Sequence, residues 1–231
     1  MKGSIKRGIP VAICLFSLLL CYCANQQQEK KTKEEKQQVG EKVTQGLAAE
    51  GTWNGVTYQY NEDTGTLTVS GKIIKGVGFQ YWEEKDELPW GKWREDAKEL
   101  VLEEGVECIT GSAFREFRNL EKIVFPNTLK KIGSYAFYNS TREIKKLELP
   151  DSVEEIGWCA FAQTSFYKGL EEIRLPKKLR SIGELAFAAQ AMTSITIPEN
   201  VESMEAYIFE DCLLLEKVII KSKKIKKIHG C

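Results

Sequence analysis

A unit of about two dozen residues recurs from residue 98 to the C-terminus, and it restricts the fold more than any other feature of the chain. Its clearest copy is Leu147–Phe161, with the sequence LELPDSVEEIGWCAF. An Ala-Phe pair closes four copies and an Ile-Phe pair closes a fifth, and successive phenylalanines are separated by 23, 24, 26 and 22 residues. These closing residues are Phe114, Phe137, Phe161, Phe187 and Phe209. Such a period predicts a solenoid, in which each unit forms one coil and packs on its neighbours.

Within each copy, the apolar residues predict a short strand followed by a turn. In Leu147–Leu149 two leucines flank a glutamate, which is the alternation expected of a strand with one buried face. Pro150 ends the strand, since proline donates no ladder hydrogen bond. Val153 and Ile156 supply two further apolar side chains before a glycine turns the chain. We therefore predict an α/β-type, β-rich repeat solenoid of short parallel strands, with about five coils over residues 98–231.

The first 24 residues have the pattern of a secretory signal. Basic residues precede an apolar run, Val11–Leu20, which is too short for an ordinary membrane span. Cys21 and Cys23 follow the run and are the candidates for lipidation. Each has leucine three positions earlier, as lipidated cysteines usually do, but neither has a small residue directly before it. The alternative is cleavage after Cys23 and release as a freely secreted protein.

Residues 25–50 are predicted to be a flexible tether. Between residues 25 and 46 there are six Gln, five Lys and four Glu, and only Val39 and Val43 are apolar. Such a segment cannot bury enough surface to offset the entropy lost on ordering. A short surface helix is the alternative, because Glu, Lys and Gln are good helix formers. After a lipid anchor, a tether would hold the folded part away from the membrane.

Residues 51–97 differ from the repeats and are predicted to form a small β-rich N-terminal cap. Val56–Tyr60 and Thr66–Ser70 alternate apolar and polar residues around a turn sequence, which predicts a hairpin. A short helix is expected over Lys92–Ala97. Four of the five tryptophans lie in the cap: Trp53, Trp82, Trp90 and Trp93. Because the end of a solenoid exposes its core, we interpret these rings as core packing; an exposed carbohydrate-binding platform is the alternative.

The recurring pattern L-x-x-I-x-L-P-x-x-V-x-x-I-G-x-x-A-F resembles the BspA-type leucine-rich repeat family of bacterial surface proteins. Gly65–Gly71, Pro89-Trp90 and Glu104–Val106 also resemble the segment that often precedes these repeats, so that the resemblance covers about residues 51–228. The family often has a cysteine three residues after the phenylalanine, and only Cys212 keeps it here. The resemblance implies a secreted or surface-anchored adhesion or recognition module that binds host matrix proteins, and it implies no catalytic residues.

If leucine-rich geometry holds, the outward side chains of the first strand in each copy line a concave face, which is the usual recognition surface of a solenoid. Mixed charges with apolar ends suit a protein partner better than a polyanion. The predicted partner-binding residues are Val101, Lys122, Val124, Lys146, Glu148, Glu172, Arg174, Thr196, Lys217 and Ile219. The alternative function is a structural or assembly component that stacks through exposed solenoid ends.

A second outward column alternates in charge from copy to copy: Lys130-Lys131, Glu154-Glu155, Arg180-Ser181, Glu202-Ser203. Opposite charges on neighbouring strands stabilise by about 0.2–1 kcal/mol per pair, so we interpret this column as support for stacking. The lysine-rich run Lys217–Lys227 is interpreted as protection of an exposed strand edge, with a patch that binds anions as the alternative.

Little in the sequence predicts catalysis or a cofactor. The 33 basic and 33 acidic residues balance, which does not favour nucleic acid, and the only histidine is His229. The absence of C-x-x-C makes zinc binding unexpected, so Cys108, Cys159, Cys212 and Cys231 are predicted to be buried free thiols, with external pairing of Cys231 in an oxidising compartment as the alternative. We therefore predict no enzyme activity, cofactor or metal. The protein is expected to be exported, either as a cell-surface or outer-membrane lipoprotein or in secreted form. It is expected to contact a membrane only through a lipid anchor. The sequence does not predict its oligomeric state.

Overall fold

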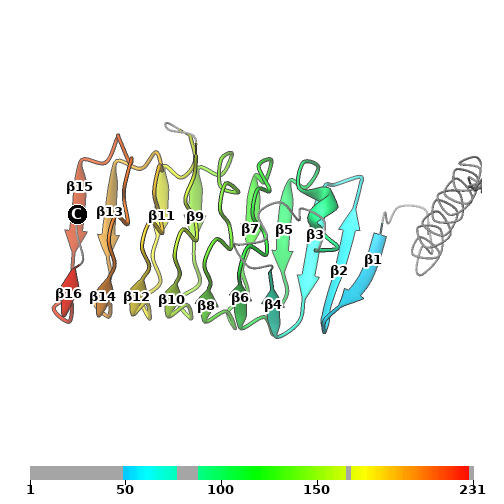
Figure 1. Ribbon diagram of the computed structural model, residues 1–231, viewed down its shortest axis with the longest axis horizontal. Helices are drawn as coiled ribbons and strands as arrows, with labels where there is room; N and C mark the ends of the chain where they lie inside the picture. Colours follow the sequence, from blue (N-terminus) through cyan, green and yellow to red (C-terminus); the bar gives the residue numbers. More distant parts are fainter. Residues whose placement is uncertain (1–48, 77–87, 165–167, 229–231) are drawn as a thin grey trace, which may run out of the picture. The chain divides into compact units, whose positions relative to one another are not determined.

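The computed structural model describes residues 49–76, 88–164 and 168–228 (Figure 1). The chain divides into two units, residues 1–43 and 44–231, and every described residue belongs to the second. The predicted signal, residues 25–48 of the predicted tether and both candidate lipidation cysteines lie outside the described residues, as do Trp82, His229 and Cys231. The last two residues assigned to the tether, Ala49 and Glu50, are instead the start of a strand, so the folded part begins slightly earlier than predicted.

Two columns of short parallel strands run along the solenoid, and each repeat contributes one strand to each column (Figure 1). We call the first the front column: β5 Glu99–Leu102, β7 Lys122–Val124, β9 Lys146–Glu148, β11 Glu172–Arg174, β13 Ser194–Ile197 and β15 Lys217–Ile220. The second is the back column: β4 Ile73–Lys75, β6 Cys108–Thr110, β8 Lys131–Ile132, β10 Glu155–Ile156, β12 Ser181–Ile182, β14 Ser203–Met204 and β16 Lys227–Ile228.

Equivalent apolar residues of successive coils are paired in register, which confirms the predicted solenoid. In the front column Leu147 lies opposite Ile173, and both are buried. In the back column Ile132, Ile156 and Ile182 follow one another and are buried as well. The repeated sequence therefore stacks each aliphatic side chain on its counterpart in the next coil.

A stack of aromatic rings fills the centre of the coils. The rings of Phe137 and Phe161 are 5.4 Å apart with an interplanar angle of 6°, and those of Phe161 and Phe187 are 5.7 Å apart at the same angle. The stack continues to Phe114 in one direction and Phe209 in the other. Aromatic pairs contribute about 0.5–1.5 kcal/mol each beyond their buried area, so this stack is a major part of the core.

The turn that carries each phenylalanine is also hydrogen-bonded from coil to coil. The Phe137 N–H donates to the Ala160 carbonyl at 2.8 Å, and the Phe161 N–H donates to the Ala186 carbonyl at 2.9 Å. The glycine that precedes the turn in three coils, at Gly133, Gly157 and Gly183, is required by close packing rather than by a left-handed conformation. A Cβ on Gly157 would lie 2.7 Å from the Ser134 backbone nitrogen, closer than carbon can approach.

Polar side chains three residues after the phenylalanine bond to the preceding coil. Ser140 donates to the Phe114 carbonyl at 2.5 Å, and the Cys212 thiol donates to the Phe187 carbonyl at 3.1 Å. Gln190 donates in the same way to the Phe161 carbonyl. In three coils the position where the family often has cysteine therefore holds a buried donor, with serine or glutamine replacing the thiol in two of them.

The N-terminal end is a three-stranded antiparallel extension of the front column: β1 Ala49–Trp53, β2 Val56–Asn61 and β3 Thr66–Ser70. The predicted hairpin is confirmed, with Thr57 opposite Ser70. β1 was not predicted, although Asn54-Gly55 has the composition and the positive φ angles of a tight hairpin turn. β3 pairs in parallel with β5, and β4 pairs with β6, so this segment also supplies strands to both columns.

Tryptophans close the core at this end. Trp90 is fully buried and stacks on Phe114 with 6.1 Å between ring centroids, and Trp93 is buried against Tyr60. A carbohydrate platform is therefore wrong for these two rings. The helix predicted over Lys92–Ala97 is also wrong, because the described chain has only a 3₁₀ turn, η1 Gly91–Trp93. The chain must extend again to enter β5 at Glu99.

Candidate functional site

All of the predicted partner-binding side chains lie on the outward side of the front column, a surface that we call the front face. Seven of them are exposed: Lys122, Lys146, Glu148, Glu172, Arg174, Lys217 and Ile219. Three are half-buried: Val101, Val124 and Thr196. Strand alternation places most of them there, because an inward side chain such as Leu147 or Ile173 separates the two outward side chains of a strand.

The front column is not one continuous sheet. β5 and β7 belong to a five-stranded sheet, whereas β9–β11 and β13–β15 form separate two-stranded sheets. In the described residues, no ladder joins β11 to β13. The break lies between coils of unequal length, since 26 residues separate Phe161 from Phe187 and 22 separate Phe187 from Phe209. Gln190 connects the two arcs by accepting a hydrogen bond from the Leu170 N–H at 2.9 Å.

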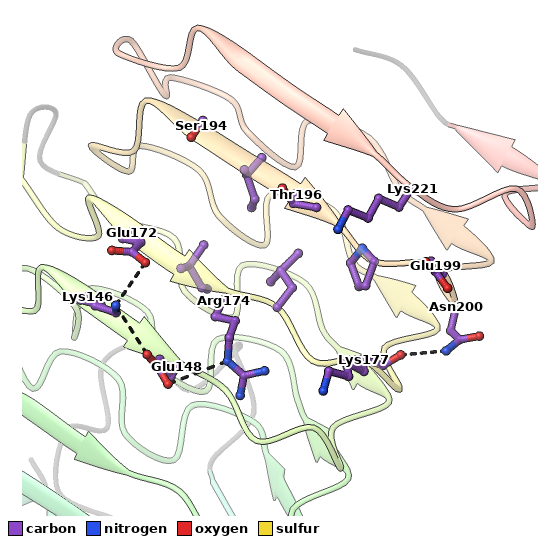
Figure 2. A pocket seen from close by; sticks show the side chains of 14 residues that line it. Lys146, Glu148, Glu172, Arg174, Lys177, Ser194, Thr196, Glu199, Asn200 and Lys221 are labelled. Atoms are coloured by element: carbon purple, nitrogen blue, oxygen red, sulfur yellow. Dashed lines mark hydrogen bonds and ion pairs between the residues drawn. The ribbon is translucent and has the colours of Figure 1, made fainter.

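A groove of about 810 Å³ opens on the front face at this break, and we call it the front groove (Figure 2). Apolar side chains of the two adjoining coils line it: Ile173, Leu175, Ile195 and Pro198. Charged and polar side chains of β9, β11, β13 and the following loops surround this apolar part. An apolar floor with a few convergent polar groups is the usual composition of a binding site.

One wall of the front groove is an ion-pair network across β9 and β11 (Figure 2). Lys146 lies 3.2 Å from Glu172 and 3.6 Å from Glu148, and Glu148 lies 3.8 Å from Arg174. The hydrogen bond to Glu172, together with the two carboxylate charges, raises the pKa of Lys146. The charges of this wall are therefore largely satisfied within the molecule.

The network continues to the loop after β9 through Asp151. Arg174 donates to Asp151 at 2.8 Å, and both the backbone N–H and the ammonium group of Lys177 also contact this carboxylate. The hydrogen bond from Arg174, followed by that from the Lys177 backbone, lowers the pKa of Asp151 from 3.8 to about 2. The carboxylate therefore stays ionised and fixes Arg174 at the groove.

The opposite wall is different, because three of its polar side chains have no partner among the described residues. The hydroxyls of Ser194 and Thr196 and the ammonium group of Lys221 line the groove from β13 and the residue after β15. In the part of the chain that the structure describes, none of the three side chains has a hydrogen bond or an ion pair. Glu199, at the end of the groove, is likewise without an ion pair among the described residues.

The sequence-based prediction identified five of the groove residues and missed the loop residues. Lys146, Glu148, Glu172, Arg174 and Thr196 were expected on this face, and the structure brings them together. Lys177, Glu199, Asn200 and Lys221 come from segments that follow the strands, outside the columns from which the face was predicted. For Lys177, Glu199 and Asn200 the available signal is the proline that ends the preceding strand, whereas Lys221 takes the place of that proline and had no such signal.

The outward residues of the back column form alternating ion pairs, as predicted. Lys131 lies 2.5 Å from Glu155, and Arg180 lies 3.7 Å from Glu154 and 3.5 Å from Glu202. The back column is a continuous seven-stranded sheet. The back face therefore supports the stacking of coils and presents paired charges to the solvent.

The described cysteines are free, and their surroundings make them poor nucleophiles. Cys159 and Cys212 are buried, whereas Cys108 is half-buried, which differs slightly from the expected burial. Burial raises the pKa of all three thiols, that of Cys159 to about 11. The thiolate is the reactive form, so these thiols are poorly suited to attack a substrate. Among the described residues there is also no cluster of three or more His, Cys, Asp or Glu side chains that could hold a metal.

Comparisons with solved structures support the same architecture. A leucine-rich repeat protein from Eubacterium ventriosum aligns with a TM-score of 0.56 and 22% identity, covering 77% of this chain and 45% of its own. The T. pallidum leucine-rich repeat protein aligns with a TM-score of 0.55 and 18% identity, covering 78% of this chain and 86% of its own. At these identities the similarity shows the fold alone. No curated protein matches this chain.

No described helix has the length and apolar character needed to cross a membrane. The sequence pattern of the BspA type leucine rich repeat region matches residues 93–212 and 164–230, in six copies. These matches begin at the tryptophans that close the core and extend through both columns of strands. With most of the chain matched and the solenoid in place, this protein belongs to the BspA-type leucine-rich repeat family.

Proposed function

We propose that this protein binds a protein partner through the front groove. The chemical difference between the two groove walls carries the proposal. Charges on the β9–β11 wall are paired within the molecule, whereas Ser194, Thr196 and Lys221 present unpartnered groups beside an apolar floor. A partner segment that covers the floor would remove apolar surface from water and satisfy these groups. Such an interaction needs no cofactor or metal, and we propose that the protein is not an enzyme.

We further propose that the protein acts outside the cell. Support comes from the signal pattern of residues 1–24, the two candidate lipidation cysteines and the polar tether that follows. Metabolic labelling with a radioactive fatty acid tests the anchor, with Cys21→Ala and Cys23→Ala as separate variants. Loss of label in one variant would identify the lipidated cysteine. Release of an unlabelled parent protein into the medium would instead indicate a secreted form.

The groove can be tested by binding to immobilised host matrix proteins. We expect the double variant Thr196→Glu with Lys221→Glu to bind at least tenfold more weakly, because it places two negative charges beside the apolar floor. Lys178→Glu is the matched control, since Lys178 is exposed and lies outside the groove. Equal binding by the groove variant and the control, or no binding by the parent protein, would contradict the proposal.

A second candidate function, assembly through the C-terminal coil, is favoured by its exposed apolar side chains. Val218 and Ile220 are 41% and 47% exposed, although their counterparts in the preceding coil, Ile195 and Ile197, are buried. Leu213 and Leu214 are exposed beside them. Sedimentation at increasing concentration tests this candidate with Val218→Ser as the variant. A parent protein that stays monomeric at high concentration would contradict it.

A further inference from the structure

The side of the solenoid formed by the Ala-Phe turns has a hollow whose origin is visible in the sequence. The residue directly after each phenylalanine forms a column: Arg115, Tyr138, Ala162, Ala188 and Glu210. In two neighbouring coils this residue is alanine, Ala162 and Ala188, which leaves open the space that arginine, tyrosine or glutamate fills in the other coils. The result is a cavity of about 280 Å³, which we call the alanine hollow.

The alanine hollow has an apolar middle and different ends. Ala162 and Ala188 form its middle with Leu185, while Tyr138 lies at one end and Glu210 and Asp211 at the other. Tyr135 and Cys159 lie beneath, and burial raises the pKa of both, so that the floor is uncharged at neutral pH. A ligand for such a site needs an aliphatic part and a charged end.

The carboxylates of Glu210 and Asp211 at the hollow have no cationic partner among the described residues. No basic side chain lines the hollow, and neither Glu210 nor Asp211 has an ion pair within the described residues. Both carboxylates are exposed. The front and back faces differ in this respect, since their carboxylates are repeatedly paired with lysine or arginine of the neighbouring coil.

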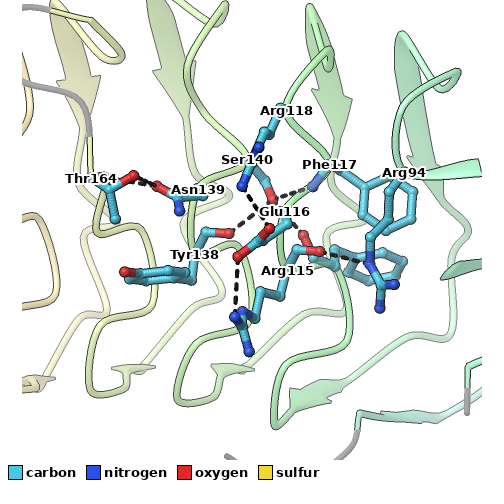
Figure 3. A network of polar contacts seen from close by, with 10 residues as sticks. Arg94, Arg115, Glu116, Phe117, Arg118, Tyr138, Asn139, Ser140 and Thr164 are labelled. Atoms are coloured by element: carbon cyan, nitrogen blue, oxygen red, sulfur yellow. Dashed lines mark hydrogen bonds and ion pairs between the residues drawn. The ribbon is translucent and has the colours of Figure 1, made fainter. Parts of the chain in front are cut away.

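The same column shows how a guanidinium pairs with a carboxylate at this position, although there the carboxylate adjoins a ring, whereas in the hollow Tyr138 and the carboxylates lie at opposite ends. The Arg115 guanidinium lies over the Tyr138 ring at 5.6 Å and pairs with Glu116 at 3.0 Å (Figure 3). Arg115 and Glu116 are the counterparts of Glu210 and Asp211 in their own coil. An aromatic ring beside a carboxylate is a favourable site for guanidinium, which stacks on rings and matches carboxylate geometry.

We propose that the alanine hollow binds an arginine side chain presented by a protein partner. The methylene groups would lie across Ala162 and Ala188, and the guanidinium would pair with Glu210 and Asp211. This site is on the turn side and does not include any residue of the front groove. It can therefore be present or absent independently of the function proposed above.

Saturation-transfer NMR with the full chain tests the site, using N-acetyl-arginine methylamide as the probe. The matched compound is N-acetyl-citrulline methylamide, which has nearly the same shape without the charge. We expect binding of the arginine compound at millimolar concentration and little binding of the citrulline compound. The double variant Glu210→Gln with Asp211→Asn should bind arginine roughly three- to tenfold more weakly, since exposed ion pairs contribute up to about 1 kcal/mol each.

The control variant is Glu103→Gln with Glu121→Gln, which removes the same charge from exposed positions outside both the hollow and the front groove. Asn is well suited to position 211, because Asp211 has a positive φ of 58° and Asn adopts this conformation readily. Unchanged melting temperatures would show that both variants fold. N-acetyl-lysine methylamide serves as a second comparison compound. The proposal would be overturned if the arginine compound did not bind, or if it bound no more tightly than the citrulline or the lysine compound. It would also be overturned if the hollow variant and the control variant bound the arginine compound equally well.

Discussion

The front and back columns are formed by the same repeat, yet they differ in how continuously their strands are paired. The back column is one seven-stranded sheet with ion pairs between neighbouring coils, whereas the front column is divided into three sheets. In the back column β8, β10 and β12 lead directly into tight turns whose glycines contact the preceding coil. The front strands follow arcs of variable length, so their spacing can change from coil to coil. Among the described strands, interrupted pairing is therefore found in the front column, on whose face the front groove opens.

The largest expected effect is on the aromatic stack that both columns enclose. Phe161 is fully buried and stacked on both sides, so we expect Phe161→Ala to lower the free energy of unfolding by about 3–5 kcal/mol. Phe209→Ala is the matched control, because Phe209 is only partly buried, with its nearest stacked ring 6.3 Å away. Urea denaturation measures both. Equal losses would show that the stack is not the centre of stability.

The second-largest effect compares the stability cost of a substitution in a back turn with that of a substitution on the front face. Gly157→Ala would place a Cβ 2.7 Å from the Ser134 nitrogen and 2.8 Å from the Gly133 carbonyl carbon, both backbone atoms. Because those atoms cannot move cheaply, we expect a loss of about 1–3 kcal/mol in the free energy of unfolding. Thr196→Ala on the front face is the control and should change stability by less than about 0.5 kcal/mol. A tolerated Gly157→Ala would mean that the back turns can separate.

A smaller effect is expected from the charges of the back face. Arg180 lies between Glu154 and Glu202, so Arg180→Glu would bring together three carboxylates and should cost roughly 1 kcal/mol or less. The loss should shrink in 1 M salt, which screens exposed charges. Lys221→Glu on the front groove reverses a charge that has no partner among the described residues and should cost less. Thermal melts at two salt concentrations measure the difference.

The interior of the coil could be predicted from the sequence because the same pattern of buried residues recurs in several copies of the repeat. Leu147, Val153 and Phe161 each have counterparts in other copies, and equivalent positions must share one environment in a solenoid. The front groove could not be predicted in this way. It depends on the offset between two adjoining coils and on Lys221, which reaches the site from beyond a strand. Such an offset is a property of a pair of coils, whereas the repeat pattern describes a single coil.

The missed strand β1 and the alanine hollow show two other limits. Asn54-Gly55 was a readable turn signal, but the residues before it lack the apolar alternation that identifies a half-buried strand. Ala162 and Ala188 were readable as small residues, and only the stacking of coils shows that they adjoin. Repeats therefore make the sequence most informative about what is shared between coils. Function is expected where neighbouring coils differ.

The smallest effect concerns the ionisation of Asp151, which joins a front strand to the loop after β9. Its pKa of about 2 in the folded protein lies below the ordinary 3.8, so its stabilising contribution is complete above pH 3.8 and is lost as the pH falls through 2. Because the carboxylate is near the surface, we expect only a slight change in overall stability. Arg174→Ala should raise the pKa of Asp151 toward 3.8 by removing its main hydrogen bond, whereas Arg180→Ala on the back face should leave it unchanged. NMR titration of the carboxyl carbon measures both variants. An Asp151 that titrates near 3.8 in the parent protein would show that Arg174 is not fixed at the groove, and both walls would then be equally free to adapt to a partner.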